Sequence, residues 1–214
     1  MNKSFAILGM GKFGQRLATD LYDAGADVLI ADEDEDLIDQ LADRATYAMT
    51  ADLSDPESIA QLGLSNMDVV VVCMARHIEA SIMCAMVAKE AGVPKVIAKA
   101  SSKRMKDVLL KVGADEVSLF EEEAASRTAR KLLSSDFIDF FDLSDNLCIV
   151  NMHPKNEWVG ENLMNLRLRE KHGINVVAIN DGNGLSAIIN PTEPLTKEMD
   201  LLCVLSKKDA AKLK

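Results

Sequence analysis

Three glycines near the start of the chain have a spacing that could hold a phosphate group. Gly9, Gly11 and Gly14 fit the pattern G-x-G-x-x-G in the stretch AILGMGKFGQRL, which begins at residue 6. We expect Gly9 to permit a tight turn, Gly11 to let the backbone approach phosphates, and Gly14 to let helix and strand pack closely. A phosphate would then lie at a helix N-terminus, where free N–H groups and the helix dipole favour an anion. The alternative is a glycine-rich turn that binds nothing.

An acidic residue follows at the distance that a dinucleotide-binding pattern requires. Asp32 ends the second predicted strand, and its carboxylate can accept hydrogen bonds from both ribose hydroxyls. The same charge would repel a 2′-phosphate, so NADP is disfavoured. The acids at residues 33–36 are expected to form a helix start and a solvated face. Asp52 ends the third predicted strand, and we expect it either near an adenine edge or in an ordinary turn.

The chain offers few groups for catalysis on a bound nucleotide. A dehydrogenase needs a proton donor near the nicotinamide, but neither Tyr22 nor Tyr47 begins a Tyr-x-x-x-Lys motif. His77 follows the fourth predicted strand and could act as a base, although we favour the alternative of a helix-start histidine. The pattern therefore predicts that the nucleotide is sensed rather than converted.

Composition narrows the classes of function further. A formal net charge of -10 over 214 residues argues against a nucleic-acid partner. The longest wholly apolar run, residues 69–75, is too short to span a membrane, and the N-terminus lacks signal-peptide features, so we expect a cytoplasmic location. The histidines lack ligand spacing and are assigned no metal. Buried, reduced thiols are expected at all the cysteines: Cys73, Cys84, Cys148 and Cys203.

The elements that must position these residues alternate along the first part of the chain. Strands are predicted at residues 4–9, 27–31, 46–50, 68–74, 95–99 and 115–119. Helices are predicted between them, at residues 13–25, 35–43, 54–63, 77–92 and 102–112. Ser54 and Glu57 are expected to form a capping box at the start of the third helix. This alternation is typical of an α/β fold with a Rossmann-like, doubly wound parallel sheet.

The pattern changes near residue 135. An aromatic-rich crossover holds Phe137, Phe140 and Phe141, and exposed aromatics of this kind would mark an oligomer interface. A hairpin is expected at the turn DGNG. The remaining predicted elements are a strand at 147–153, a helix at 163–173, and strands at 174–180, 185–189 and 200–206. We therefore expect a nucleotide-binding domain at residues 1–134 and a small α+β domain, with the crossover, at residues 135–214.

The whole chain resembles the cytosolic regulatory subunits of Trk/Ktr bacterial potassium transporters, which are built on the RCK domain (regulator of K⁺ conductance). The resemblance implies a homo-octameric ring at the inner face of the cell membrane. It also implies that ATP, ADP or NAD(H) alters K⁺ flux through a membrane pore subunit. The matching stretches occur in family order: FAILGMGKFGQRLA, VLIADEDEDLI, VVVVCMARHIEASI, VIAKASS, KVGADEV, FFDLSDNLCIV and LRLREKHGINVVAI.

The resemblance also implies roles for individual residues. Position 12 is lysine, where many ATP-responsive members carry arginine. Glu121 falls where some members carry a carboxylate that helps bind a divalent cation, Mg²⁺ or Ca²⁺, near the nucleotide. Arg169 falls where some members contact cyclic di-AMP in the C-terminal half. The implied nucleotide site consists of Gly9, Gly11, Lys12, Phe13, Gly14, Asp32, Asp52, Ala75, Lys99 and Glu121.

Two other functions stay open at this point. A small NAD-dependent oxidoreductase would turn over its cofactor with a carbonyl compound, whereas a sensor would only bind it. A free-standing nucleotide-binding protein would have no membrane partner. Turnover of the cofactor would distinguish the oxidoreductase from a sensor. Co-purification with a K⁺ pore subunit would distinguish a transporter subunit from the free-standing binding protein.

Overall fold

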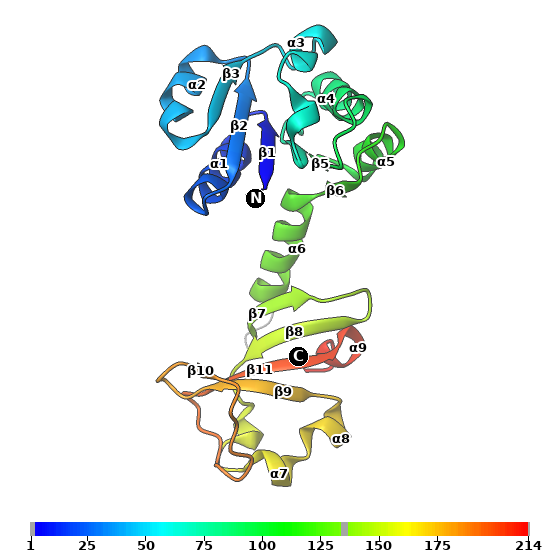
Figure 1. Ribbon diagram of the computed structural model, residues 1–214. Helices are drawn as coiled ribbons and strands as arrows, with labels where there is room; N and C mark the ends of the chain where they lie inside the picture. The colour runs from blue at the N-terminus through cyan, green and yellow to red at the C-terminus, as the bar shows by residue number, and fades with distance from the viewer. Residues whose placement is uncertain (1–2, 134–136, 214) are drawn as a thin grey trace. The chain divides into compact units, whose positions relative to one another are not determined.

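Parallel strands form the sheet of the N-terminal part of the chain in the computed structural model, which describes residues 3–133 and 137–213. The strand order is β3-β2-β1-β4-β5-β6 (Figure 1), the order of the doubly wound dinucleotide-binding fold. Each neighbouring pair is parallel, so the Rossmann-like prediction is confirmed. The strands are β1 (Ser4–Leu8), β2 (Asp27–Asp32), β3 (Tyr47–Thr50), β4 (Val69–Val72), β5 (Lys95–Lys99) and β6 (Glu116–Ser118).

Helices cover both faces of this sheet, as the alternation of elements predicts. Ala18 of α1 and Ile38 of α2 pack with Ile7, Ile30 and Val71 on one face. The helices α3, α4 and α5 pack on the other face through Ile59, Cys84, Leu109 and their neighbours. The helices are α1 (Lys12–Asp23), α2 (Glu35–Leu41), α3 (Pro56–Ala60), α4 (Ile78–Glu90), α5 (Lys103–Lys111) and α6 (Phe120–Leu133), with 3₁₀ turns at Ala42–Arg44 and Leu64–Asn66.

The start of α3 differs from the expected capping box. The N-cap residue is Asp55, whose carboxylate accepts a hydrogen bond from the backbone N–H of Ser58 at 2.9 Å. Ser54 is not free to cap, because its hydroxyl donates to Asp52 at 2.6 Å. The prediction of a capping box between Ser54 and Glu57 is therefore wrong. An ionised carboxylate at the helix start is favoured by the helix dipole over a hydroxyl.

The C-terminal part contains an antiparallel sheet of order β10-β9-β11-β8-β7 (Figure 1). Side chains alternate between buried and partly exposed along β8 and β11, and the buried face packs on Trp158 and Leu168. This arrangement confirms the predicted small α+β unit. Its elements are β7 (Phe137–Asp142), β8 (Leu147–Met152), a 3₁₀ turn (Asn156–Trp158), α7 (Leu163–Leu166), α8 (Leu168–His172), β9 (Asn175–Asn180), β10 (Leu185–Ser186), β11 (Asp200–Ser206) and α9 (Lys207–Ala210).

The helix expected at residues 163–173 is broken at Arg167, which has a left-handed backbone with φ 48°. At about 100° per residue, a continuous helix would direct Leu168 far away from Leu163 and Leu166. All three leucines instead pack against the same core. The break therefore allows Leu168 to pack on the same core as Leu163 and Leu166. This is a tertiary effect that helical periodicity does not predict.

The aromatic crossover also differs from expectation. Residues 137–142 form the edge strand β7, paired antiparallel with β8. Phe140 is 7% exposed and belongs to the core of this unit, so it does not mark an exposed interface. Phe141 is 40% exposed, and the guanidinium of Arg127 lies 5.4 Å from the centre of its ring.

Contacts divide the chain into two compact units, residues 1–122 and 123–214, so α6 begins in the first unit and ends in the second. The domain boundary expected between residues 134 and 135 lies outside the described residues. Within residues 3–133 and 137–213, no helix combines the length and the apolar character needed to cross a membrane.

Candidate functional site

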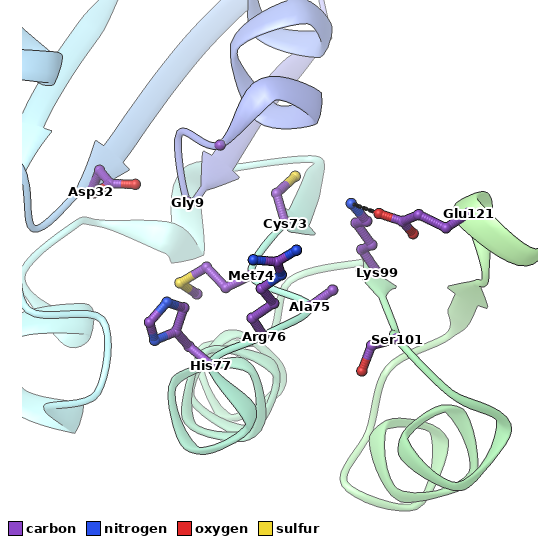
Figure 2. A pocket seen from close by; sticks show the side chains of 11 residues that line it. Gly9, Asp32, Cys73, Met74, Ala75, Arg76, His77, Lys99, Ser101 and Glu121 are labelled. Carbon is purple, nitrogen blue, oxygen red and sulfur yellow. Dashed lines mark ion pairs between the residues drawn. The ribbon is translucent and has the colours of Figure 1, made fainter.

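A cleft of about 460 Å³ opens at the carboxyl ends of the parallel strands (Figure 2). Strand order reverses between β1 and β4, and doubly wound sheets bind ligands at such a switch point. The volume lies within the range of small-molecule sites, about 300–1,000 Å³. The lining residues are Gly9, Gly11, Asp32, Cys73, Met74, Ala75, Arg76, His77, Lys99, Ser101 and Glu121.

The glycine turn leaves room at one position and is tightly packed at two others. A Cβ at Gly9, where φ is 95°, would lie 2.4 Å from Cγ of Met74. A Cβ at Gly14 would lie 2.1 Å from the carbonyl oxygen of Gly9, so Gly14 allows the helix to pack on the backbone of the turn itself. A Cβ at Gly11 would meet nothing within 4 Å. Gly11 is also the N-cap residue of α1, so the open space lies in front of free helix N–H groups.

Asp32 connects the end of β2 to this turn. Its Oδ2 accepts a hydrogen bond from the backbone N–H of Met10 at 2.5 Å, and its Oδ1 accepts one from the N–H of Asp34 at 3.2 Å. A carboxylate has about four lone-pair sites, so the side chain keeps acceptor capacity. Because Asp32 also lines the cleft, that capacity is available to a ligand hydroxyl.

Two cationic side chains line the cleft. Lys99 ends β5, its side chain is 14% exposed, and its Nζ lies 2.6 Å from Oε1 of Glu121. The hydrogen bond from Lys99 is the largest cause that holds the pKa of Glu121 below its usual value, and the charge of Arg76 adds to it. Arg76 lies in the loop between β4 and α4 and is exposed. The cleft thus combines positive charge with a helix N-terminus.

Sequence reasoning did not single out Arg76 or Ser101, although both line the cleft. Each lies shortly after the carboxyl end of a parallel strand, and that position is the signal that could have identified them. Ser81 was also missed. Its fully buried hydroxyl lies 2.5 Å from the carbonyl oxygen of Met74 and 2.9 Å from that of His77, so it fixes the loop that carries Arg76.

Some residues of the implied site lie outside the lining of the cleft. Lys12 is the first residue of α1 and is exposed. Phe13 stacks on Phe120, with ring centres 4.5 Å apart. Gly14 is buried beneath the turn, as described above. Whether Lys12, Phe13 and Gly14 take part in binding stays a prediction.

His77, by contrast, lines the cleft, and it occupies the N-cap position of α4.

Asp52 lines a separate hollow of about 310 Å³. Its Oδ1 accepts hydrogen bonds from the hydroxyl and the backbone N–H of Ser54, at 2.6 and 2.8 Å. The hydrogen bond from the Ser54 hydroxyl is the largest cause that lowers the pKa of Asp52, and the bond from the Ser54 N–H is the next. The carboxylate therefore makes the hydrogen bonds of an ordinary turn, and a place near an adenine edge stays a prediction. Other residues of the hollow are Glu33, Met49, Thr50, Ala51, Ser58, Gln61 and Leu62.

The described residues contain no group of three or more His, Cys, Asp or Glu side chains that could hold a metal ion. The four cysteines are buried thiols outside any disulfide bond, as predicted. Burial raises the pKa of Cys73 to about 12, so the thiol at the cleft wall is not a reactive thiolate. Arg169 is an exposed residue of α8 in the second unit.

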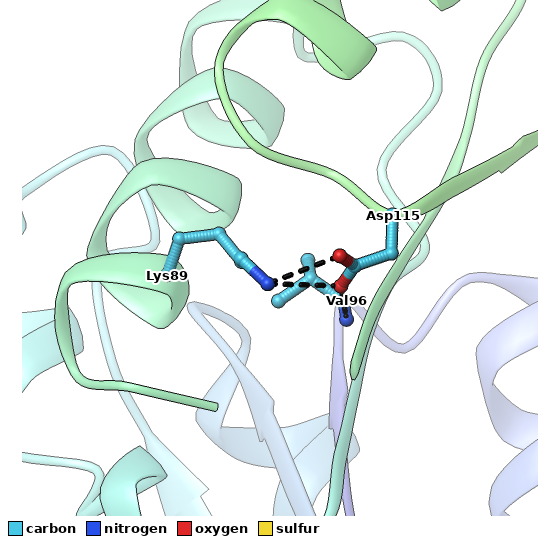
Figure 3. Close-up of polar contacts among 3 residues, drawn as sticks. All are labelled: Lys89, Val96 and Asp115. Atoms are coloured by element: carbon cyan, nitrogen blue, oxygen red, sulfur yellow. Dashed lines mark hydrogen bonds and ion pairs between the residues drawn. The ribbon is translucent and has the colours of Figure 1, made fainter. Parts of the chain in front are cut away.

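A polar cluster with a structural role lies at the amino ends of the parallel strands, opposite to the cleft (Figure 3). Asp115 accepts a hydrogen bond from the backbone N–H of Val96 at 2.7 Å, and Nζ of Lys89 lies 3.0 Å from its Oδ2. The Val96 bond is the largest cause that lowers the pKa of Asp115. Asp115 precedes β6 and Val96 lies near the start of β5, so the cluster connects the amino ends of two strands.

The fold and the cleft agree with the family to which the sequence belongs. Residues 5–119 match the model of the TrkA-N domain, and the chain belongs to the TrkA-N domain family. It is 34% identical to the Ktr system potassium uptake protein C of Bacillus subtilis (strain 168), over 99% of this chain and 96% of that protein. It is 32% identical to the Ktr system potassium uptake protein A of Vibrio alginolyticus, over 100% and 97%. The resemblance to Trk/Ktr proteins is thus confirmed.

Solved structures show the same fold. The GsuK channel superimposes with a TM-score of 0.69 at 14% identity, covering 100% of this chain and 39% of that one. The GsuK channel bound to NAD gives a TM-score of 0.66, also at 14% identity and with the same coverage. This chain therefore spans well under half the length of those structures, and at such identity the likeness concerns the fold alone.

Proposed function

We propose that this chain is a nucleotide-sensing regulatory subunit of a bacterial potassium uptake system. One observation supports this proposal above the others. The cleft at the β1/β4 switch point brings the glycine turn, Asp32, Arg76 and Lys99 together, in a chain similar over its whole length to Ktr potassium uptake proteins. Such a set of groups fits an anionic nucleotide that carries ribose hydroxyls.

The chemistry of the cleft suggests how an adenine nucleotide binds. Its phosphates lie at the N-terminus of α1 in front of Gly11, where N–H groups and the helix dipole favour an anion. Arg76 and Lys99 supply counter-charge, and Asp32 accepts from the ribose hydroxyls. The base extends toward the hollow lined by Asp52. The carboxylate of Asp32 disfavours a 2′-phosphate, so the proposed ligands are ATP, ADP or NAD(H) rather than NADP.

The same arrangement supports sensing rather than catalysis. His77 is the histidine of the cleft, the residue type that most often acts as a general base, and it occupies the N-cap position of α4. We propose that the ligand is bound and released unchanged, and that its identity alters the assembly. In this proposal the chain is a cytoplasmic subunit of an octameric ring at the inner face of the membrane, with a K⁺-translocating pore protein as partner.

Two further ligands belong to the proposal through the family resemblance. Glu121 lines the cleft and is 69% exposed, so its carboxylate is accessible to a divalent cation, Mg²⁺ or Ca²⁺, that a triphosphate brings with it. Arg169 is exposed on α8, where its guanidinium could contact a phosphate of cyclic di-AMP.

Calorimetry on the purified chain tests the proposed function. ATP, ADP, NADH and cyclic di-AMP are titrated separately, and the adenine nucleotides are then titrated in competition. We expect saturable binding of at least one adenine nucleotide, and we expect the adenine nucleotides to displace one another. In a separate experiment, we expect the chain to co-purify with a membrane K⁺ subunit. Carbonyl-dependent oxidation of NADH would instead support a small oxidoreductase. Nucleotide binding without any membrane partner would support a free-standing binding protein.

A further inference from the structure

The contact between Lys99 and Glu121 places a carboxylate where an incoming phosphate would need a cation. Nζ of Lys99 lies 2.6 Å from Oε1 of Glu121, and both residues line the cleft. Figure 2 shows the two side chains meeting, Lys99 from the end of β5 and Glu121 from the start of α6. Lys99 is 14% exposed and Glu121 is 69% exposed, so the cation is held at the wall while the carboxylate faces solvent.

The same contact is tied to the glycine turn. Glu121 is the second residue of α6, and the first, Phe120, stacks on Phe13 with ring centres 4.5 Å apart. Phe13 lies in the first turn of α1, between Gly11 and Gly14 of the glycine turn. Nζ of Lys99 also lies 5.6 Å from the centre of the Phe13 ring, within the range of a cation–π contact. The Lys99–Glu121 ion pair and the Phe13–Phe120 stack thus both hold the start of α6.

A phosphate and the Glu121 carboxylate cannot both use Lys99 without repelling each other. A ligand with several negative phosphate oxygens attracts Lys99 more strongly than the single, largely exposed carboxylate does. The pair is only partly buried, because the Glu121 side chain is 69% exposed, and solvent screening weakens an ion pair of this kind. The carboxylate is therefore weak enough to be displaced, and Arg76 remains nearby to hold a second phosphate oxygen.

We propose that Glu121 is a built-in competitor for Lys99, displaced when the phosphates of a nucleotide enter the cleft. This inference rests on the proposed function and concerns how the same site is regulated. The displacement replaces the Lys99–Glu121 contact by a contact between Lys99 and a phosphate, while the Phe13–Phe120 stack stays in place. Ligands with more phosphate charge displace Glu121 more completely, and a nucleoside, which carries no phosphate, leaves the pair in place.

Binding in metal-free buffer tests the competition, because a divalent cation would give Glu121 a second role as ligand. Affinities of ATP, ADP and adenosine are measured by calorimetry in the presence of a chelator. Glu121→Gln removes the competing charge, so ATP and ADP should bind about two- to fivefold more tightly than to wild type, while adenosine affinity stays unchanged. Lys99→Met should weaken ATP binding about tenfold or more, and Lys99→Arg should restore most of it.

The chain offers a matched control one residue further along α6. Glu122 pairs with Lys103 at 3.3 Å, and neither residue lines the cleft. Glu122→Gln should leave all three affinities unchanged. In the double variant Lys99→Met with Glu121→Gln, the gain from Glu121→Gln should disappear, because the cation for which the two anions compete is gone.

The outcomes separate this inference from the proposed function. If wild type binds no nucleotide, the proposed function fails. If wild type binds ATP, but Glu121→Gln binds it equally or more weakly without metal, Glu121 is not a competitor and the inference is overturned. A gain that persists in the double variant, or that also occurs with adenosine, overturns it too, since neither result depends on Lys99 and a phosphate.

Discussion

The carboxylate of Asp32 accepts the backbone N–H of Met10 at 2.5 Å, so the end of β2 is bonded directly to the turn that follows β1. The proposed ribose acceptor therefore has a fixed position before any ligand arrives. A fixed acceptor loses little conformational freedom on binding, which favours affinity. The same bond means that Asp32 supports the shape of the turn as well as the proposed ligand.

Asp32→Ala should weaken adenine nucleotide binding by about 1.5–3 kcal/mol, since it removes charge-assisted hydrogen bonds to ribose. Calorimetry gives the affinity, and thermal unfolding reports on the loss of the Met10 bond. Asp36→Ala is the matched control, because Asp36 is an exposed acid in the first turn of α2 that does not line the cleft. Affinity equal to wild type would remove Asp32 from the site.

Arg76→Met should weaken nucleotide binding and also make it less dependent on salt, because an exposed cation attracts phosphates through a screened interaction. The measurement is the ATP affinity at low and at physiological ionic strength. Arg104→Met, on the exposed face of α5 and outside the lining of the cleft, should change neither quantity. If both variants lose affinity equally, the effect comes from net charge and not from the position of Arg76.

Lys12→Ala should reduce any preference for ATP over ADP, and Lys12→Arg should widen it. The lysine is an exposed point charge at the start of α1, whereas arginine offers a rigid fork that grips a terminal phosphate. We expect wild type to favour ATP by about 0.5–1.5 kcal/mol through partly screened attraction. The ratio of ATP to ADP affinities in the three proteins is the observable. Three identical ratios would mean that Lys12 does not sense the γ-phosphate.

Asp115→Ala should destabilise the N-terminal unit by about 1–2 kcal/mol, because the N–H of Val96 loses its acceptor, while nucleotide affinity stays unchanged. The folded-state pKa of Asp115 is lowered, so its contribution is present above the unfolded pKa and is lost as pH falls through the folded pKa. The stability difference from wild type should therefore shrink below about pH 4. Denaturant unfolding at several pH values checks this, and a constant difference would contradict it.

The purified chain should form an even-numbered homo-oligomer, with eight chains as the expected number. Light scattering coupled to size exclusion measures the mass directly. Because Phe140 lies in the core of its own unit, the crossover supplies less exposed aromatic surface than the sequence suggested. A stable monomer at micromolar concentration would count against the ring.

The alternation of apolar strands with amphipathic helices predicts the parallel sheet well, since the central strands β1, β2 and β4 are buried on both faces over most of their length and read as continuous apolar runs. The glycine turn and Asp32 could also be predicted, because backbone geometry demands those residue types at those positions. Arg76 and Ser101 could not be separated from other loop residues in the same way. The strand order decides which loops lie beside the cleft, and this order cannot be read directly from a single sequence.

The C-terminal unit shows where periodicity reaches its limit. The break at Arg167 depends on burying Leu168 beside Leu163 and Leu166, and this is a tertiary requirement. The strand β7 could not be predicted from its sequence FIDFFD, because apolar and polar residues do not alternate regularly in it. Short elements of this kind gain their stability from neighbours distant in sequence.

The near contact of Gly9 and Gly14 limits how this chain can change by mutation. A side chain at position 14 would have to occupy the place of the Gly9 carbonyl oxygen, 2.1 Å from its Cβ. No single substitution at position 9 can relieve that overlap, because the oxygen belongs to the backbone. Steric overlap therefore opposes a side chain at either position, whereas a Cβ at Gly11 would meet nothing within 4 Å and faces no such steric limit. A lineage that abandoned its ligand would be expected to lose the middle glycine first.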